Sequence, residues 1–335
     1  MIALSGGGTG GHLSIIRALK NALNAKGIEP IYIGSNSGQD RTWFENEDGF
    51  LEKFFLNSSG VVNKKGFKKA TSLIQILKSG STCRTIFKEY NIKSLISVGG
   101  YSAAPASFAT IASRVDLYIH EQNAAMGRLN KILKPFAKEF FSSYDKNSKI
   151  KDYPVDISFF QKRKSIKNLR TIIFLGGSQG ARAINSLAMD LSKELSKKGI
   201  NIIHQTGKND FQKIKKFYKQ NSINADVFDF SPKLIDKISK ADFAISRSGA
   251  STLWELCALG IPTLFIPYPY AAGDHQYYNA KNLADKKLAL LKREGEIEAK
   301  TILQEIEKLN LEEISNNLKK EIKPNGAMQI IESIL

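Results

Sequence analysis

The sequence is poor in the residues that build disulfides and metal centres. Its 335 residues include two cysteines, Cys83 and Cys257, and four histidines. Two cysteines do not make the disulfide framework of a small secreted protein, and we interpret them as signs of a reducing, cytoplasmic setting. The histidines lie in four separate segments without the spacing of metal ligands, so we expect no metal site.

Long apolar runs and a leader pattern are also missing. No stretch approaches the ~20 apolar residues that span a bilayer. Residues 1–6 have neither the basic region nor the apolar core of a secretory signal. We therefore expect a protein that is not exported and does not cross a membrane, although it can lie on one.

Several nucleotide-binding signatures are absent. The sequence has no GxxxxGK[ST] stretch, which excludes a P-loop. Ile33 is followed by Gly34 and Ser35, where a dehydrogenase would carry the acidic residue that binds the ribose hydroxyls. A dehydrogenase is therefore disfavoured. There is also no Asp-x-Asp pair, which a metal-dependent sugar-nucleotide transferase normally needs.

Basic residues outnumber acidic residues in the chain. The formal net charge of +17 favours anionic partners, such as nucleic acid, a phosphorylated substrate or an anionic membrane surface. The alternative is that the lysines form solvated faces with no partner. A nucleic-acid-binding protein would interleave basic and aromatic residues on one face or carry a known module, and neither pattern is found. Apolar residues make up 42% of the chain, enough for two domain cores.

The chain repeats its own opening half a chain later. In each half a short apolar strand leads into a glycine-rich loop, a helix that ends at Lys-Gly, and a second strand. The first copy covers residues 2–34 and the second covers residues 171–204. Strand and helix patterns continue to alternate after both copies. This alternation predicts two α/β, Rossmann-like lobes, each with a parallel sheet between layers of helices.

The two glycine loops, residues 6–11 and 176–180, predict anion binding. A glycine loop between strand and helix lets the backbone approach a ligand and aims free N–H groups at an anion. Tight turns without a ligand are the alternative. His12 follows the first loop, either as a solvated residue at a helix start or as a base at the carboxyl edge of the sheet.

Polar residues also gather after later strands. His120-Glu121-Gln122-Asn123 closes a strand with four polar side chains, which indicates a cleft. Thr252 and Glu255 have the spacing of a helix capping box; alternatively, the Glu255 carboxylate accepts hydrogen bonds from both hydroxyls of a ribose. Residues 274–280 supply amides and aromatic rings suited to a sugar.

Six motifs in one order resemble the family of peptidoglycan glycosyltransferases that add N-acetylglucosamine from UDP-N-acetylglucosamine to lipid I. They span residues 7–280, which is nearly the whole chain. The motifs are Gly7-Gly8-Thr9-Gly10-Gly11-His12, Gly99-Gly100-Tyr101 with Pro105, His120-Glu121-Gln122-Asn123, Gly176-Gly177-Ser178-Gln179-Gly180-Ala181-Arg182, Arg247-Ser248-Gly249-Ala250 with Thr252 and Glu255, and Asp274-His275-Gln276 with Asn279-Ala280.

The resemblance implies the GT-B-type fold of metal-independent glycosyltransferases, with two Rossmann-like lobes facing across a cleft. Residues 1–156 would form the lobe facing acceptor and membrane, residues 157–318 the UDP-sugar lobe, and residues 319–335 a helix packing back on the first lobe. No cofactor is implied, and no nucleic acid. The implied partners are UDP-N-acetylglucosamine, lipid I (undecaprenyl-pyrophosphoryl-muramyl pentapeptide) and the anionic lipid surface at the cytoplasmic face of the bacterial inner membrane.

The resemblance also implies roles for individual residues. The 4-hydroxyl of the muramyl sugar attacks the anomeric carbon with inversion, and either His12 or Glu121 would act as the base; the sequence does not choose between them. Ser178, Gln179 and Gly180 would contact the diphosphate, and Glu255 the ribose. The other substrate-binding residues would be Thr9, Gly10, Gly11 and Asn123 in the first lobe, and Ala250, Ser251, Thr252 and Gln276 in the second.

The chain departs from the family pattern at the junction between the lobes. Asp156 stands where the family usually has an arginine near the donor diphosphate, which reverses the charge. Either Arg182 or Arg247 is a possible replacement. Another two-lobed UDP-sugar enzyme, such as a glycolipid glycosyltransferase or a UDP-N-acetylglucosamine 2-epimerase, would share the loops and Glu255 but not the acceptor-side segments around Gly99 and His120.

The stretch from Lys64 to Lys78 mixes basic and apolar residues. Basic residues near anionic lipid contribute about 1 kcal/mol each, so this stretch is a candidate membrane contact. An amphipathic core helix with a lysine face is the alternative. The residues concerned are Lys64, Lys65, Phe67, Lys68, Lys69, Leu73, Ile74, Ile76, Leu77 and Lys78.

Overall fold

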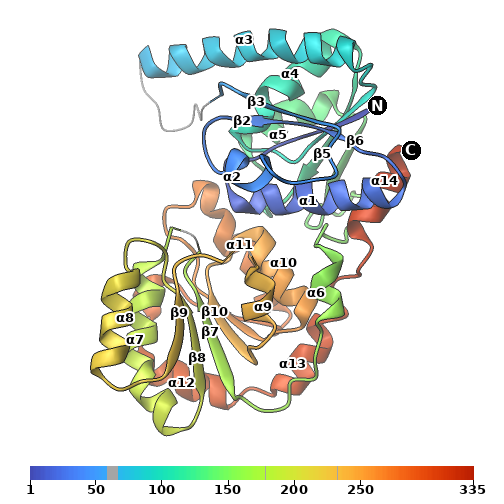
Figure 1. The fold of residues 1–335 in the computed structure, drawn as a ribbon. Helices are drawn as coiled ribbons and strands as arrows, with labels where there is room; N and C mark the ends of the chain where they lie inside the picture. Colours follow the sequence, from blue (N-terminus) through green and yellow to red (C-terminus); the bar gives the residue numbers. More distant parts are fainter. Residues whose placement is uncertain (59–66, 178, 232) are drawn as a thin grey trace. The chain divides into compact units, whose positions relative to one another are not determined.

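The computed structural model describes residues 1–58, 67–177, 179–231 and 233–335 (Figure 1). It divides into two compact units: unit 1 comprises Met1–Asp156 and Pro324–Leu335, and unit 2 comprises Ile157–Lys323. In the described part of the chain, no helix has both the length and the apolar character needed for a bilayer crossing. Cys83 and Cys257 are both buried and free of disulfides.

Unit 1 contains a parallel six-stranded sheet in the order β3-β2-β1-β4-β5-β6. The strand order reverses between β1 and β4, and ligands of open α/β sheets bind at the carboxyl ends of strands at such a point. Its elements are β1 (Ile2–Ser5), α1 (Gly10–Ala25), β2 (Ile31–Ser35), α2 (Asp40–Phe44), β3 (Glu52–Leu56), α3 (Phe67–Glu89), β4 (Ser94–Ser97), η1 (Tyr101–Ala103), α4 (Ala104–Ser113), β5 (Asp116–Glu121), α5 (Arg128–Leu133), η2 (Lys134–Phe136), β6 (Glu139–Ser142) and α14 (Gly326–Ile334).

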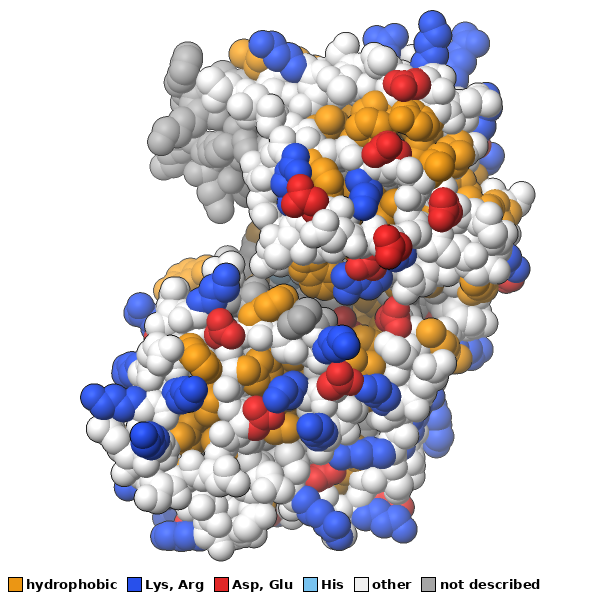
Figure 2. Space-filling model, in the orientation of Figure 1, with side chains coloured by type: hydrophobic (Ala, Val, Ile, Leu, Met, Phe, Trp, Pro, Cys, Tyr) orange, Lys and Arg blue, Asp and Glu red, His pale blue; other side chains and the backbone are white. Residues whose placement is uncertain are grey.

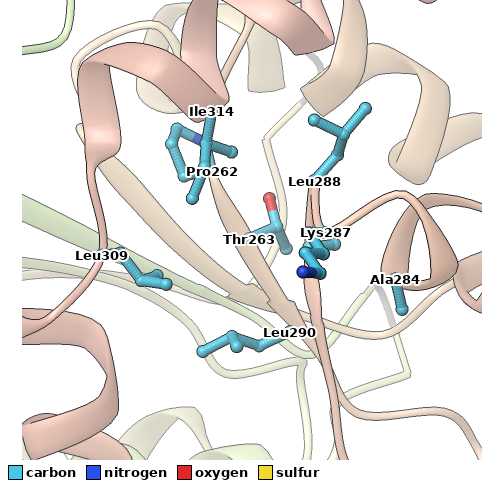
Figure 3. A pocket seen from close by; sticks show the side chains of 9 residues that line it. Pro262, Thr263, Ala284, Lys287, Leu288, Leu290, Leu309 and Ile314 are labelled. Atoms are coloured by element: carbon cyan, nitrogen blue, oxygen red, sulfur yellow. The ribbon is translucent and has the colours of Figure 1, made fainter.

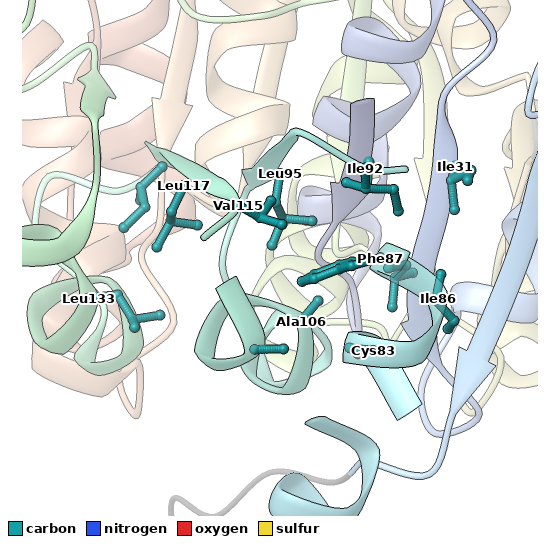
Figure 4. Close-up of a cluster of buried hydrophobic side chains, with 14 residues drawn as sticks. Ile31, Cys83, Ile86, Phe87, Ile92, Leu95, Ala106, Val115, Leu117 and Leu133 are labelled. Atoms are coloured by element: carbon teal, nitrogen blue, oxygen red, sulfur yellow. The ribbon is translucent and has the colours of Figure 1, made fainter. Parts of the chain in front are cut away.

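One face of this sheet packs against α3 and α4. Figure 4 shows the Phe87 ring of α3 between Leu95 of β4 and Ala106 of α4, and Cys83 of α3 belongs to the same buried cluster. Burial raises the pKa of the Cys83 thiol to about 12, so the side chain stays an uncharged part of the core. The central strands are buried on both faces, which is why they read as continuous apolar runs in the sequence.

Unit 2 repeats this topology, in the order β12-β11-β10-β7-β8-β9. The strand order here reverses between β7 and β10, so the predicted duplication is confirmed at the level of strand order. Its elements are α6 (Ile157–Gln161), β7 (Thr171–Leu175), α7 (Arg182–Lys197), β8 (Asn201–Gln205), α8 (Phe211–Gln220), β9 (Ala225–Phe228), α9 (Leu234–Ile238), β10 (Phe243–Ser246), α10 (Ala250–Leu259), β11 (Thr263–Phe265), η3 (Ala272–Asp274), α11 (His275–Asp285), β12 (Leu290–Leu291), η4 (Glu294–Glu296), α12 (Ala299–Glu307) and α13 (Leu311–Leu318).

The end of the chain returns to unit 1 as α14. This helix packs against α1, and Lys26 Nζ lies 2.8 Å from Glu332 Oε1. The start of α14 approaches the backbone of residues 152–153 so closely that a Cβ on Gly326 would stand 2.4 Å from the carbonyl oxygen of Asp152. Glycine at position 326 is therefore required by the contact between two pieces of backbone.

The first glycine loop is tied to the second strand by a buried carboxylate. Asp40 begins α2, is fully buried, and accepts the backbone N–H of Gly8 at Oδ2 over 2.6 Å. Its Oδ1 accepts the backbone N–H of Ser35 at 2.8 Å and the hydroxyl of Tyr32 at 3.1 Å. A Cβ on Gly7 would stand 2.3 Å from Asp40 Oδ1. The loop thus already holds an anion, and that anion belongs to the protein.

We predict that Gly326→Ala destabilises unit 1. The added methyl group overlaps backbone that cannot rotate away, and overpacking of this kind costs about 1–3 kcal/mol. The midpoint of thermal unfolding should fall by several degrees. Gly295→Ala is the matched control, because no described atom lies within 4 Å of a Cβ there. Equal midpoints for the two variants would contradict the prediction.

We predict that Asp40→Asn loosens the first glycine loop. The amide keeps one oxygen, so at least one of the three donors faces an NH₂ group, and a buried donor without an acceptor costs about 1–3 kcal/mol. Thermal unfolding of the full chain measures the loss. Glu45→Gln, an exposed change just past the same helix, serves as the control. Equal midpoints of thermal unfolding for Asp40→Asn and Glu45→Gln would show that the Asp40 carboxylate does not hold the loop.

Candidate active site

The glycines of unit 1 pack the loops at the carboxyl ends of β1 and β4 against each other. A Cβ on Gly100 would stand 2.6 Å from the carbonyl oxygen of Gly7, and a Cβ on Gly8 would stand 2.6 Å from the ring of Tyr101. Gly8 and Gly100 also have positive φ angles, of 84° and 79°, which favour glycine. The Tyr101 hydroxyl donates to the carbonyl of Ser37 over 2.7 Å. Close packing and turn geometry therefore account for these glycines.

His12 lies half-buried in the first turn of α1, between two polar side chains. Its Nδ1 lies 3.0 Å from Thr9 Oγ1, and its Nε2 lies 2.7 Å from the amide nitrogen of Gln122. The ring also lies against Gly100, where a Cβ would stand 3.4 Å from Nε2. The alternative of a solvated histidine is wrong, because the ring is held at both nitrogens.

His120, on β5, is a second imidazole near His12. Burial, followed by the neighbouring His12, lowers the pKa of His120 to about 3. His120 is therefore neutral at physiological pH. Its ring meets Tyr153 edge-on, with ring centroids 5.4 Å apart.

Glu121, the other candidate base, is buried and anchors the loop that follows β5. Its Oε1 accepts the backbone N–H of Asn123 at 2.9 Å, and its Oε2 accepts the backbone N–H of Gly127 at 2.9 Å. The amide nitrogen of Asn130 donates to the same Oε2, also at 2.9 Å. Both oxygens are thus engaged in shaping residues 121–130, the segment that presents Gln122 and Asn123.

The second glycine loop lies at the reversal point of the unit 2 sheet. Gly180 packs tightly there, since a Cβ would stand 2.6 Å from the carbonyl oxygen of Thr206. By contrast, no described atom lies within 4 Å of a Cβ built on Gly177 or on Gly249, which follows the adjacent strand β10. Ser178 lies outside the described residues. Gln179 is exposed and Gly180 is half-buried.

Helix α10 begins three residues earlier than a capping box at Thr252 requires. Gly249 occupies the N-cap position and Ala250 the first helical position, so the capping-box alternative for Glu255 is wrong. Ser251 is buried, whereas Thr252 and Glu255 are half-buried. Glu255 follows Ser251 by four residues and therefore shares its face of the helix.

Other polar residues of the candidate site in unit 2 hold loops in place through hydrogen bonds to the backbone. Gln276 Oε1 accepts the backbone N–H of Tyr268 at 2.9 Å, and the amide of buried Asn279 donates to the carbonyl of Ser248 at 3.2 Å. Arg247 donates to the carbonyls of Ile266 and Pro267 and pairs with Glu294. Its guanidinium is thus engaged inside unit 2. Arg182 is exposed at the first residue of α7.

Two other features bear on where chemistry can occur. A cavity of about 250 Å³ in unit 2 is lined by residues at the amino ends of β11 and β12, including Thr263 and Leu290 (Figure 3). It therefore lies at the sheet edge opposite the glycine loop.

Among the described residues, no group of three histidine, cysteine or acidic side chains gathers in a way that could hold a metal ion.

The positive charge is spread over the face of the molecule that Figure 2 shows. Figure 2 shows lysine and arginine side chains scattered over the visible face of both units and interspersed with aspartate and glutamate. That face carries no continuous basic stripe of the kind that tracks a nucleic-acid backbone.

Comparison with known proteins covers the whole chain. The model of the glycosyltransferase family 28 N-terminal domain matches residues 2–142, and that of the C-terminal domain matches residues 171–334. A protein of Campylobacter jejuni subsp. jejuni is 54% identical over 100% of this chain and 97% of its own length. A protein of Sulfurovum sp. is 50% identical over 98% and 96%, respectively. Both are named UDP-N-acetylglucosamine–N-acetylmuramyl-(pentapeptide) pyrophosphoryl-undecaprenol N-acetylglucosamine transferase.

Solved structures agree on the fold. The crystal structure of Acinetobacter baumannii MurG aligns with a TM-score of 0.79 at 24% identity, covering 99% of this chain and 98% of that one. The glycosyltransferase SnogD from Streptomyces nogalater aligns with a TM-score of 0.69 at 13% identity, covering 100% of this chain and 98% of that one. The predicted GT-B-type fold is confirmed, and the chain is a member of glycosyltransferase family 28.

Proposed function

We propose that this chain transfers N-acetylglucosamine from UDP-N-acetylglucosamine to the 4-hydroxyl of the muramyl sugar of lipid I, with inversion, giving lipid II and UDP. The observation that carries the proposal is the 54% identity, over the full chain, to a relative named for this transfer. The acceptor-side segments around Gly100 and His120 favour lipid I over the acceptors of other two-lobed UDP-sugar enzymes.

The donor belongs to unit 2 in this proposal. Loop 176–180 and the start of α10 follow the adjacent strands β7 and β10. No described atom lies within 4 Å of a Cβ built on Gly177 or Gly249, which leaves room for a ligand beside them. N–H groups at two helix starts can stabilise the charge that develops on the leaving diphosphate. Where the family usually has an arginine near the donor diphosphate, this chain has Asp156. We propose that Arg182, exposed at the start of α7, supplies the missing positive charge.

Individual roles in the donor site are those that the family resemblance implies. Glu255, half-buried on α10, would accept hydrogen bonds from both ribose hydroxyls, which suits a carboxylate. Gln276 would contact the sugar. The diphosphate would be contacted by Ser178, Gln179 and Gly180, and the nucleoside by Ala250, Ser251 and Thr252.

The nucleophile is activated in unit 1. An alcohol attacks the anomeric carbon efficiently only when a base accepts its proton, and we assign that role to His12. Glu121 is less suited, because two of its three partners are backbone N–H groups, of Asn123 and Gly127, which fix the loop after β5. His12 Nε2 instead meets a side-chain amide, that of Gln122, which can turn away from it. The role of Glu121 is to shape the loop. Thr9, Gly10, Gly11 and Asn123 would supply a hydroxyl, backbone N–H groups and an amide to the reacting sugars.

A further part of the proposal places the acceptor face of unit 1 on an anionic lipid surface, at the cytoplasmic face of the bacterial inner membrane. On α3, Ile74 and Leu77 are 52% and 74% exposed, although the later turns of that helix bury Cys83 and Phe87 in the core. The core-helix alternative therefore describes only the second half of α3. Figure 1 shows α3 on the outside of unit 1, over α4.

Helix α4 and the segment after α5 extend this apolar surface. Ile111 and Phe136 are exposed and line one shallow hollow together with Arg114. Exposed basic residues, Lys78 and Arg114, flank the apolar ones, as expected of a surface that meets anionic headgroups. The side chains of Lys64, Lys65, Phe67, Lys68, Lys69 and Leu73 lie outside the described residues.

We predict that His12→Ala lowers the rate of transfer about 10²–10⁴-fold, because a general base contributes that much. Binding of UDP-N-acetylglucosamine should be unchanged, since the donor site lies in unit 2. The measurement is a transfer assay with UDP-N-acetylglucosamine and a short-chain lipid I analogue, run in the presence of a chelator, with calorimetry for donor binding. Asn21→Ala, exposed on the same helix, is the control.

The same assay separates two failures. If the natural chain made no product, or made it only when metal was restored, the proposed function would be overturned. If the natural chain were active and His12→Ala kept full activity, only the assignment of the base would fall.

For the membrane contact, we predict that Ile74→Asp weakens binding to vesicles containing phosphatidylglycerol about tenfold or more. The reason is that burial of an isoleucine in the membrane interface, worth roughly 1.5–3 kcal/mol, is lost. Ile157→Asp in unit 2, at a site with 49% exposure, is the matched control and should bind normally. Vesicle co-sedimentation measures both. Vesicle binding that depended neither on the anionic lipid content nor on the salt concentration would contradict the proposal.

A further inference from the structure

Gln122 makes a contact with His12 that the family motifs do not explain. It follows β5 directly, is buried, and points its amide nitrogen at His12 Nε2 over 2.7 Å. Thr9 Oγ1 lies 3.0 Å from the other ring nitrogen. The imidazole is thus held from two elements, the first turn of α1 and the end of β5.

The direction of these hydrogen bonds defines the tautomer. An amide NH₂ only donates, so His12 Nε2 must carry the lone pair. The proton of the neutral ring then sits on Nδ1 and donates to Thr9 Oγ1. An amide also carries an oxygen, and a half turn presents that oxygen to the ring. Glutamine can therefore pair with Nε2 both before and after Nε2 has gained a proton, which neither a carboxylate nor an apolar side chain can do.

We propose that Gln122 is a positioning residue for the transfer: its amide holds His12 with the lone pair on Nε2, then turns and accepts the hydrogen bond from the protonated Nε2. The inference rests on the proposed function. In the step itself, the acceptor oxygen bonds to the anomeric carbon as the bond to the UDP oxygen breaks, and UDP leaves with the electron pair. The acceptor hydroxyl first displaces the Gln122 N–H from the single lone pair of His12 Nε2, and its proton then passes to Nε2. Thr9 accepts from Nδ1–H throughout.

The titratable groups that the described residues place near the His12 loops, namely His120, Glu121, Asp40, Tyr32 and Tyr101, are neutral or already paired. His120 on β5 has a pKa lowered to about 3 by burial and is uncharged. The carboxylate of Glu121 is engaged by the loop after β5, and that of Asp40 by Gly8, Ser35 and Tyr32. Burial, followed by Asp40, raises the pKa values of Tyr32 and Tyr101, so both stay protonated. Among these described neighbours, Gln122 is the one in direct contact with Nε2.

The test compares Gln122→Glu and Gln122→Met in the full chain. The chain has four histidines, so NMR of ¹⁵N-histidine-labelled protein resolves each ring, and His12→Ala assigns the signals. Ring titration and tautomer are followed with pH, and kcat and KM are measured in the transfer assay. Gln220→Glu, the same chemical change at an exposed site on α8, is the control.

A carboxylate at position 122 stabilises the imidazolium. In Gln122→Glu, the midpoint pH of the His12 titration should therefore rise by about one unit. The acid limb of the pH profile of kcat/KM should rise by the same amount. In Gln122→Met, kcat should fall about tenfold to a hundredfold with an unchanged KM for the donor, because the ring is misplaced. An unmoved His12 titration in Gln122→Glu, or full kcat in Gln122→Met, would overturn the inference.

The two proposals fail separately. If the natural chain showed no transfer, the proposed function would fall, while the NMR titration would still test the contact between Gln122 and His12. If Gln122→Met did not fold, the near-isosteric Gln122→Glu carries the test through its titration.

Discussion

The pairing of β1 with β4, and of β7 with β10, determines which residues of this chain can act together. In each sheet the strand order reverses at that pair, so the loops after the two strands lie side by side and their helices diverge. Gly100 meets Gly7 and His12 for this reason, although more than eighty residues separate them in the sequence. The candidate residues in unit 1 lie at or just after the ends of β1, β4 and β5, which are neighbours in the sheet, whereas Asp40 follows β2.

The two copies of the repeat use this edge differently. In unit 1 the protein fills the space itself: Asp40 takes the N–H of Gly8, and the ring of Tyr101 packs on the same glycine. In unit 2 the positions beside Gly177 and Gly249 are open among the described residues. A loop whose N–H already binds a carboxylate is poorly suited to hold a substrate's diphosphate at that point. The contrast supports the donor site in unit 2 and leaves the edge of unit 1 to position side chains.

The sequence predicted the parts of this structure that depend on local pattern. The buried central strands, the two glycine loops and the duplicated order were all found, because apolar runs and Lys-Gly helix ends are visible in a single stretch of chain. Strand β3, with Glu52 and Lys53 in its first half, has neither a continuous apolar run nor a clean alternation, so the sequence pattern does not reveal it. The capping-box alternative for Glu255 is wrong because the spacing of Thr252 and Glu255 does not tell where the helix begins.

The contacts that define the candidate site could not be predicted in this way. Asp40 and Gln122 are ordinary polar residues in the sequence, and each gains its role from a partner far along the chain: Gly8 in one case and His12 in the other. One signal was available for Asp40. The acidic residue missing directly after Ile33 appears a few positions later, at the start of α2, where it turns toward the protein's own loop.

An amide beside His12 also suits the charge of the proposed substrates. In many hydrolases a carboxylate orients the catalytic histidine and stabilises the imidazolium. Donor and acceptor here would each carry a diphosphate, and an unpaired carboxylate next to the reacting groups would repel both. Asp40 and Glu121 have their charges satisfied by backbone N–H groups, and His120 is neutral. Gln122 can orient the ring without adding negative charge, which we regard as the reason that an amide occupies this position.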